Sequence, residues 1–248
     1  GSINRSVGGL LAVARPGFDR VTLESGGDLR FLLQNDSEPR TRLWTRGDLD
    51  LIAAQLYPVT GAEAEVLAGY TRNPVSGVNV FDPTRMLRVA RSGGVTAPLP
   101  AVPYSAFGSL RLAATNVEQG GVVRAPLGAI VLGDVSSALG SQRLTLLPGS
   151  VTSVSGAGLL MPYGGTTDGV SYKFKGAEVS LVGAGGATGS GGGASLRTGI
   201  TLGFRDVDAL PGSVLDLSGG GELTGAGFVS GRGGSTDARY SPLVLSLI

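Results

Sequence analysis

Four aspartates are the residues of this chain whose type and spacing could support catalysis. Asp206, Asp208 and Asp216 lie close together in the sequence, and Asp168 ends a glycine-rich turn that recurs at 233–237. Two carboxyl groups about 5–10 Å apart in a cleft can cleave a glycosidic bond, and clustered oxygens can bind Ca²⁺. Aspartate at such a turn is equally explained by hydrogen bonds between its side chain and the nearby backbone. We treat the four as a candidate acidic patch and predict no catalytic residues, so no enzyme.

A second candidate is the tripeptide Arg46-Gly47-Asp48, which has the sequence of an integrin-binding motif. In an adhesive protein it would bind a host-cell receptor. Gly47 also opens an alternating segment in which Leu49 and Leu51 are expected to point into a core. The tripeptide can therefore be the corner before a strand, and in a chain rich in Gly, Arg and Asp it arises easily by chance.

Composition excludes several other classes of chemistry. The 248 residues include no histidine and no cysteine, which excludes imidazole catalysis, thiol nucleophiles, disulfides and thiolate-bound metals. The net charge of +1 argues against a nucleic-acid partner. The glycine run at 183–189 superficially resembles a dinucleotide loop, but more glycines follow it where a helix is required. We therefore expect no cofactor, no metal, and a flexible loop over 183–195. The aromatic residues are too scattered to predict a sugar-stacking platform.

Glycine makes up 43 of the 248 residues, more than twice its usual share of about 7%, and many glycines open a short repeated phrase. In this phrase a glycine and a polar residue precede alternating branched apolar residues, which is typical of a short strand with one buried face. Copies lie twenty positions apart, at 27–31 and 47–51 and again at 108–112 and 128–132. The segment 63–68 fits either one helical turn or a further strand with Glu63 and Glu65 outward, and we favour the strand.

A longer duplication relates residues 147–168 to residues 210–237, with a six-residue insertion in the second copy. Together with the short phrases it predicts an all-β fold, a right-handed parallel β-helix (β-solenoid) with loop excursions. A β-sandwich is the alternative. About twelve coils of about twenty residues would form a rod of roughly 55–60 Å. Residues 1–107 are expected to be less regular coils with proline-rich loops, and 108–248 the regular part of one continuous solenoid, excised from a longer chain.

Several phrases in combination resemble filamentous-haemagglutinin-like exoproteins of Gram-negative two-partner secretion systems. They lie within 47–61, 120–130, 163–169 and 212–221, so that the resemblance spans about residues 45–237. It implies a right-handed parallel β-helix, export through an outer-membrane secretion pore, and a surface or extracellular filament used in adhesion. The Asn-Pro-Asn motifs of the family's secretion domain are reduced here to Asn73-Pro74-Val75, which points to an interior or late section. The family offers no catalytic residues.

The expected function is a structural or adhesive shaft segment of a large adhesin, secreted to or displayed on the surface of a Gram-negative bacterium. Its expected partners are the secretion pore, neighbouring coils of the same long chain, and a host-cell or bacterial-surface receptor or glycan. The alternative is a β-helical module that binds or processes carbohydrate. Terminal coils would expose unpaired strand edges, which predicts end-to-end association that depends on concentration.

Overall fold

The computed structural model describes residues 17–32, 40–72, 79–134, 140–167, 171–174, 177–178 and 198–226. Their secondary structure consists of strands and turns without a helix, so the predicted all-β class is confirmed, and most of the strand pairs are parallel. No helix in these ranges could cross a membrane. The loop predicted over 183–195 lies outside the described residues.

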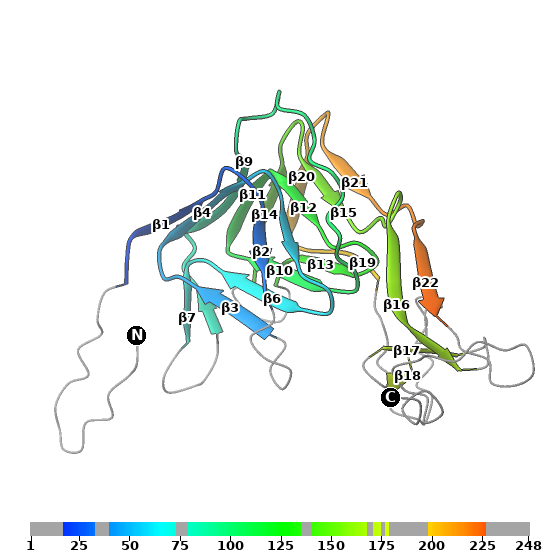
Figure 1. Ribbon diagram of the computed structural model, residues 1–248. Coiled ribbons are helices and arrows are strands. Elements are labelled where there is room, and N and C mark those ends of the chain that lie inside the picture. Colours follow the sequence, from blue (N-terminus) through cyan, green and yellow to red (C-terminus); the bar gives the residue numbers. More distant parts are fainter. Residues whose placement is uncertain are drawn as a thin grey trace, which may run out of the picture.

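Three parallel sheets make up most of the described chain (Figure 1). Sheet A contains, in spatial order, β1 (Arg20–Glu24), β4 (Asp48–Ala53), β9 (Met86–Arg91), β11 (Asn116–Gly120), β14 (Arg143–Leu146) and β20 (Asp206–Ala209). Sheet B contains β2 (Leu29–Phe31), β5 (Leu56–Pro58), β12 (Val122–Arg124), β15 (Val151–Ser153) and β21 (Val214–Asp216). Sheet C contains β3 (Arg40–Trp44), β6 (Glu63–Leu67), β10 (Ser109–Ala113), β13 (Ala129–Gly133) and β19 (Gly199–Gly203).

The remaining strands interrupt this order at two places. An antiparallel pair, β7 (Tyr70–Arg72) and β8 (Asn79–Phe81), lies between β6 and β9 in the sequence. A separate sheet contains β16 (Leu160–Thr167), β17 (Ser171–Phe174), β18 (Ala177–Glu178) and β22 (Glu222–Ala226), with β22 parallel to β16. Elsewhere the chain visits sheets A, B and C in turn, as β1, β2, β3 and then β4, β5, β6, except that it passes from β9 in sheet A directly to β10 in sheet C.

The predicted twenty-residue period holds at one pair of phrases and is wrong for the other. Ser109 lies beside Ala129, so the copies at 108–112 and 128–132 are neighbours in sheet C. The copies at 27–31 and 47–51 instead contribute to different sheets, through β2 and β4. The phrase therefore marks the start of a strand, and one circuit of the three sheets contains several strands.

The spacing between stacked strands is usually longer than twenty residues. Leu29 lies beside Leu56 and Asn116 beside Arg143, a separation of 27 residues in both cases. The expected twelve coils are also wrong for the described residues, because sheet A holds six strands. At about 4.8 Å between strands, six strands extend over roughly 24 Å.

The long duplication is stacked in its first part only. Val151 lies beside Val214, and the amide of Gly149 donates to the carbonyl of Gly212 at 2.9 Å, so residues 63 positions apart are neighbours. Farther along, Leu160 lies beside Glu222. The sequence copies at 156–160 and 225–229 are therefore not stacked on each other in the register that their similarity gives.

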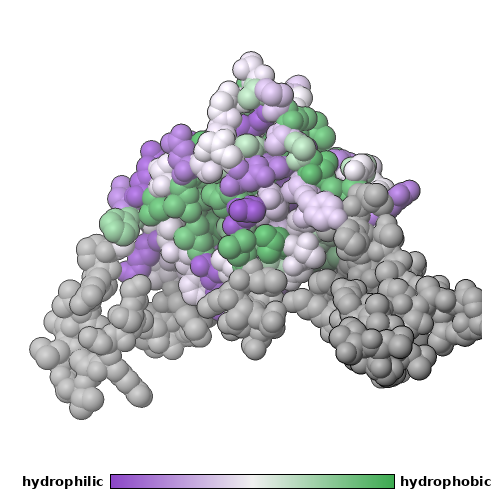
Figure 2. Space-filling view, viewed as in Figure 1, coloured by the Kyte–Doolittle hydropathy of each residue, from purple (hydrophilic) through white to green (hydrophobic). Residues whose placement is uncertain are grey.

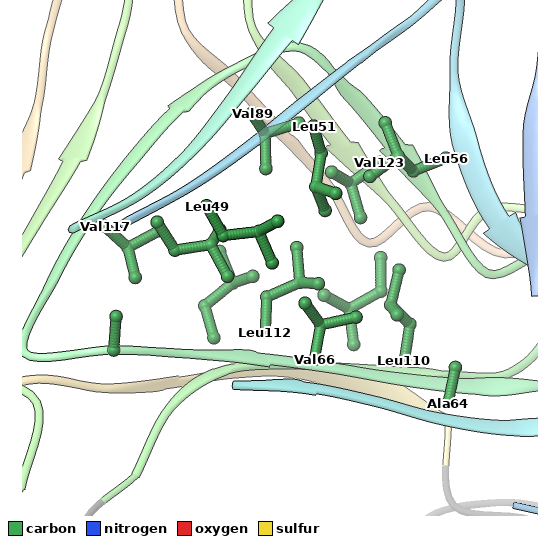
Figure 3. Packing of buried hydrophobic residues seen from close by; sticks show 14 of the residues in the cluster. Leu49, Leu51, Leu56, Ala64, Val66, Val89, Leu110, Leu112, Val117 and Val123 are labelled. Carbon is green, nitrogen blue, oxygen red and sulfur yellow. The ribbon is translucent and has the colours of Figure 1, made fainter. Parts of the chain in front are cut away.

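The core lies between the three sheets, where alternate side chains of each strand meet (Figure 3). Leu49 and Leu51 from sheet A, Leu56 from sheet B, and Leu110 and Leu112 from sheet C are completely buried. Each such side chain stabilises the fold by about 1.5–3 kcal/mol relative to exposure. In β6, Ala64 and Val66 are buried and the intervening glutamates are not, which confirms the predicted orientation.

Glycine is required where the stacked backbones approach most closely. A Cβ atom on Gly128 would lie 2.0 Å from the carbonyl oxygen of Gly108, its neighbour in the stack before β13. The corner has no room for any side chain, which explains why both copies of this phrase begin with glycine.

Candidate functional site

The Arg46-Gly47-Asp48 tripeptide forms the corner before β4. Gly47 is buried, and a Cβ atom there would lie 2.0 Å from the carbonyl oxygen of Asp19. The Asp48 carboxylate accepts the backbone N–H of Met86 at 3.0 Å. Arg46 is exposed, but the carboxylate that a receptor would need is half-buried and engaged with the neighbouring strand. This geometry favours the corner interpretation over receptor binding.

The candidate acidic patch is divided between two sheets. Asp206 and Asp208 are exposed on β20 of sheet A, and Asp208 pairs with Arg143 at 3.3 Å. Asp216 belongs to β21 of sheet B, and Asp168 lies outside the described residues. Within the described ranges no three acidic side chains gather closely enough to hold a metal ion.

Asp216 is held by hydroxyl groups. Its carboxylate accepts hydrogen bonds from Ser153 at 2.8 Å and from the hydroxyl and backbone N–H of Ser218. These hydrogen bonds, first of all that from the Ser218 hydroxyl, lower the pKa of Asp216 below its ordinary value. Asp216 is therefore an ionised residue whose carboxylate is held in place at the end of β21.

A row of alternating charges crosses the outer face of sheet A. Asp50 lies between Arg20, at 3.2 Å, and Arg88, at 3.7 Å, and Arg88 also pairs with Glu118 at 2.8 Å. These residues come from β1, β4, β9 and β11, which are successive strands of sheet A. Opposite charges on neighbouring strands stabilise the pairing of these strands.

An aromatic group that the sequence did not predict lies beside sheet C. Trp44 of β3 packs at a tilt against Tyr70 of β7, with ring centres 5.0 Å apart, and Tyr70 meets Phe81 edge-on at 5.8 Å. Phe81 and Tyr70 are buried, whereas Trp44 is 48% exposed. The buried rings pack against the indole, about half of whose surface stays exposed.

Charged groups surround this indole. Its N–H donates to the carboxylate of Glu65 at 3.1 Å, and the guanidinium of Arg42 lies 6.0 Å from the ring centre. Arg111 bridges Glu65, at 3.3 Å, and the buried Asp134, at 2.6 Å. We call Trp44, Arg42, Glu65 and Arg111 the indole site. An exposed ring with charged groups beside it is suited to contact with the apolar C–H face of a sugar and to hydrogen bonds with its hydroxyls.

The sequence contained one signal of the indole site. In the segment Arg40–Trp44, alternation places Arg40, Arg42 and Trp44 on one face, opposite Thr41 and Leu43. Tyr70 and Phe81 come from a hairpin that no short phrase marks. Their meeting depends on the order of strands. Two of these three rings are buried, so the cluster does not test the prediction that the aromatic residues form no sugar-stacking platform.

A proline-rich loop replaces the sheet B strand between β9 and β10. Arg91 donates to the carbonyl groups of Val95, Ala97 and Pro98, and Arg124 donates to that of Pro100 at 2.8 Å. Burial lowers the pKa of Arg124. The two arginines hold the loop by its backbone.

Two apolar side chains of the same loop, Leu99 and Tyr104, are exposed. The loop was predicted from its prolines, whereas its attachment through buried arginines was not.

Comparison of the chain with protein-family models, with curated proteins and with solved structures returned no match.

Proposed function

We propose that sheets A, B and C are the faces of a right-handed parallel β-helix, and that the chain is a shaft segment of a secreted or surface-displayed adhesin. The observation that carries this proposal is the order of the strands. Each sheet begins with a strand from residues 20–44 and ends with one from residues 199–216, and all neighbours within it are parallel. A right-handed crossover is the rule for parallel strands.

The stacking supports a mechanical role. Within a stack each strand bonds to the strands before and after it, and the buried leucines form columns that continue from one strand to the next. The outward row Arg20–Asp50–Arg88–Glu118 adds ion pairs between the same strands. Load along such a body is shared by many backbone hydrogen bonds. Export through an outer-membrane pore and a place on a Gram-negative surface rest on the sequence resemblance.

Single-molecule pulling from the two ends of the chain tests the shaft proposal. Neighbouring strands of sheet A are separated by 27 to 63 residues, so one coil releases roughly 90–220 Å of extended chain. We expect lengthening in several steps within this range, since each coil is held mainly by its neighbours. A single step that releases the whole folded length at once would contradict a shaft built of separable coils.

The adhesive part of the proposal is tested by attachment of cells to surfaces coated with the chain. Because Asp48 is engaged with Met86, we expect Asp48→Glu to leave integrin-dependent attachment unchanged once circular dichroism shows that the variant is folded. Attachment lost in the folded variant would instead assign the tripeptide to receptor binding.

The indole site favours a second function, binding of carbohydrate on a side face. Trp44 is the single tryptophan of the chain, so its fluorescence reports on this site alone. Titration with a panel of oligosaccharides should change the emission of the wild-type protein, and Trp44→Ala should abolish binding measured by calorimetry. Tyr104→Ala, which removes an exposed ring elsewhere, is the matched control. Unchanged emission across the panel would remove this candidate.

A further inference from the structure

The three parallel sheets end together on both sides of the molecule. Strands β1, β2 and β3 form one boundary, which we call the leading edge, and β20, β21 and β19 form the other, the trailing edge. Among the described residues each of these six strands has a neighbour on one side only. Unpaired strand edges offer backbone N–H and C=O groups to any further strand.

Inward-facing side chains lose their cover at the trailing edge. Val207 of β20 is 41% exposed, although Leu144, which lies beside it in β14, is completely buried. Leu215 of β21 is 38% exposed, although Leu56 and Val123, which share its position in sheet B, are completely buried. On the leading edge Leu23 is exposed as well. The view in Figure 2, from the side of β1 to β3, shows hydrophobic surface between hydrophilic groups.

The two edges carry opposite charge. The strands of the leading edge contain four arginines and one glutamate, a net charge of +3: Arg20, Arg30, Arg40, Arg42 and Glu24. The strands of the trailing edge contain three aspartates and no basic residue, a net charge of −3: Asp206, Asp208 and Asp216.

The register of the stack aligns these charges. Following the paired residues through sheet A, Arg20 and Asp206 occupy the same position along their strands. The corresponding path through sheet B places Arg30 and Asp216 at one position. Val21 and Val207 share a position on the inward face of sheet A. If a second copy continued the stack in this register, Asp206 would lie opposite Arg20 and Val207 opposite Val21. In sheet B, Asp216 would lie opposite Arg30.

We propose that the trailing edge of one copy docks on the leading edge of a second copy, so that the three sheets continue across the junction. The interface is head-to-tail, and it leaves a free edge at each end for further copies. Docking pairs the open backbone groups, covers Val207 and Leu215, and brings Asp206 to Arg20. The proposed interface depends only on the parallel sheets of the structure. Evidence against it would therefore leave the proposed shaft function untouched, and the reverse also holds.

Sedimentation of the full chain over a wide concentration range, together with two charge reversals, tests this interface. Asp206→Arg places like charges opposite Arg20, and Arg20→Asp places them opposite Asp206. We expect the wild-type protein to form chains of increasing length, and each variant alone to associate about tenfold more weakly. Circular dichroism confirms that the exposed substitutions leave the fold intact.

A mixture of the two variants provides the decisive control. In head-to-tail contacts between different variants, every junction again combines an arginine with an aspartate, so the mixture should recover association. A wild-type protein that stays monomeric at all concentrations would overturn the proposal, as would variants that associate like the wild type. If the mixture associates no more strongly than each variant alone, the edges bind something other than a second copy of this chain.

Discussion

The middle of the stack and its trailing coil contain the same alternation of apolar and polar residues, yet they differ in burial. Leu56 in β5 is completely buried, whereas Leu215, at the equivalent position in β21, is exposed. The sequence pattern assigns both leucines to the inward face. Burial is decided by the next strand in the stack, which Leu56 has on both sides and Leu215 on one. Stability in such a body is set by contacts between neighbouring strands.

Truncation of the two leucines should give the largest difference. Leu56→Ala leaves a cavity in the packed core and should lower the free energy of unfolding by about 2–5 kcal/mol. Leu215→Ala removes a side chain that solvent already reaches, and we expect a loss of less than about 1 kcal/mol. Urea denaturation measures both values. Equal losses would show that the trailing coil is covered in solution.

Glycine corners allow a second comparison, with a smaller effect. Gly128→Ala forces a methyl group against the Gly108 carbonyl oxygen and should destabilise the protein by about 1–3 kcal/mol. Gly219, near the trailing edge, has no atom within 4 Å of the position of a Cβ, and Gly219→Ala should change stability by less than about 0.5 kcal/mol. Thermal unfolding compares the two, and similar shifts in Tm would contradict the close approach at the corner.

The smallest expected effect concerns acid sensitivity at the trailing coil. The pKa of Asp216 is lowered in the folded state, so its ionised form stabilises the fold above its ordinary value of 3.8, and this stabilisation is lost as the pH falls through the lowered pKa. Ser218→Ala removes a hydroxyl donor and should reduce the stability gained between about pH 2 and pH 5.

The matched control for this change is Ser213→Ala, because the Ser213 hydroxyl binds the carbonyl of Leu210 and not Asp216. Tm measured across this range should respond to pH less steeply in Ser218→Ala than in the control. Identical profiles would show that the Ser218 hydrogen bond does not hold the carboxylate in solution.

Local patterns were sufficient to predict the strand type and many of the inward faces. Alternation correctly placed Leu49, Leu51 and Val66 in the core, and the glycine phrase correctly located corners such as Gly128. The number of strands in one circuit could not be predicted, because the same phrase opens strands of all three sheets. The spacing of stacked strands depends on the length of each loop, which short phrases do not encode.

The indole site shows the same limit for function. Trp44, Glu65 and Tyr70 are brought together by the pairing of β3 with β6 and by the hairpin that follows. Conversely, Asp208 and Asp216 are only eight positions apart and belong to different sheets. Distance along the sequence is therefore a poor guide to proximity where each strand turns a corner into another sheet.

The central claim is that the strands stack in the proposed β-helix, and spin-label distances test it most directly. The chain has no cysteine, so pairs can be introduced on the outer face of sheet A. Thr22 and Thr145 are four strands apart, and Thr22 and Asp208 are five. Cysteine labels at these pairs should give narrow distributions whose mean backbone separations are roughly 19 Å and 24 Å, one strand spacing apart. Broad distributions, or a second distance no longer than the first, would contradict the stacked arrangement.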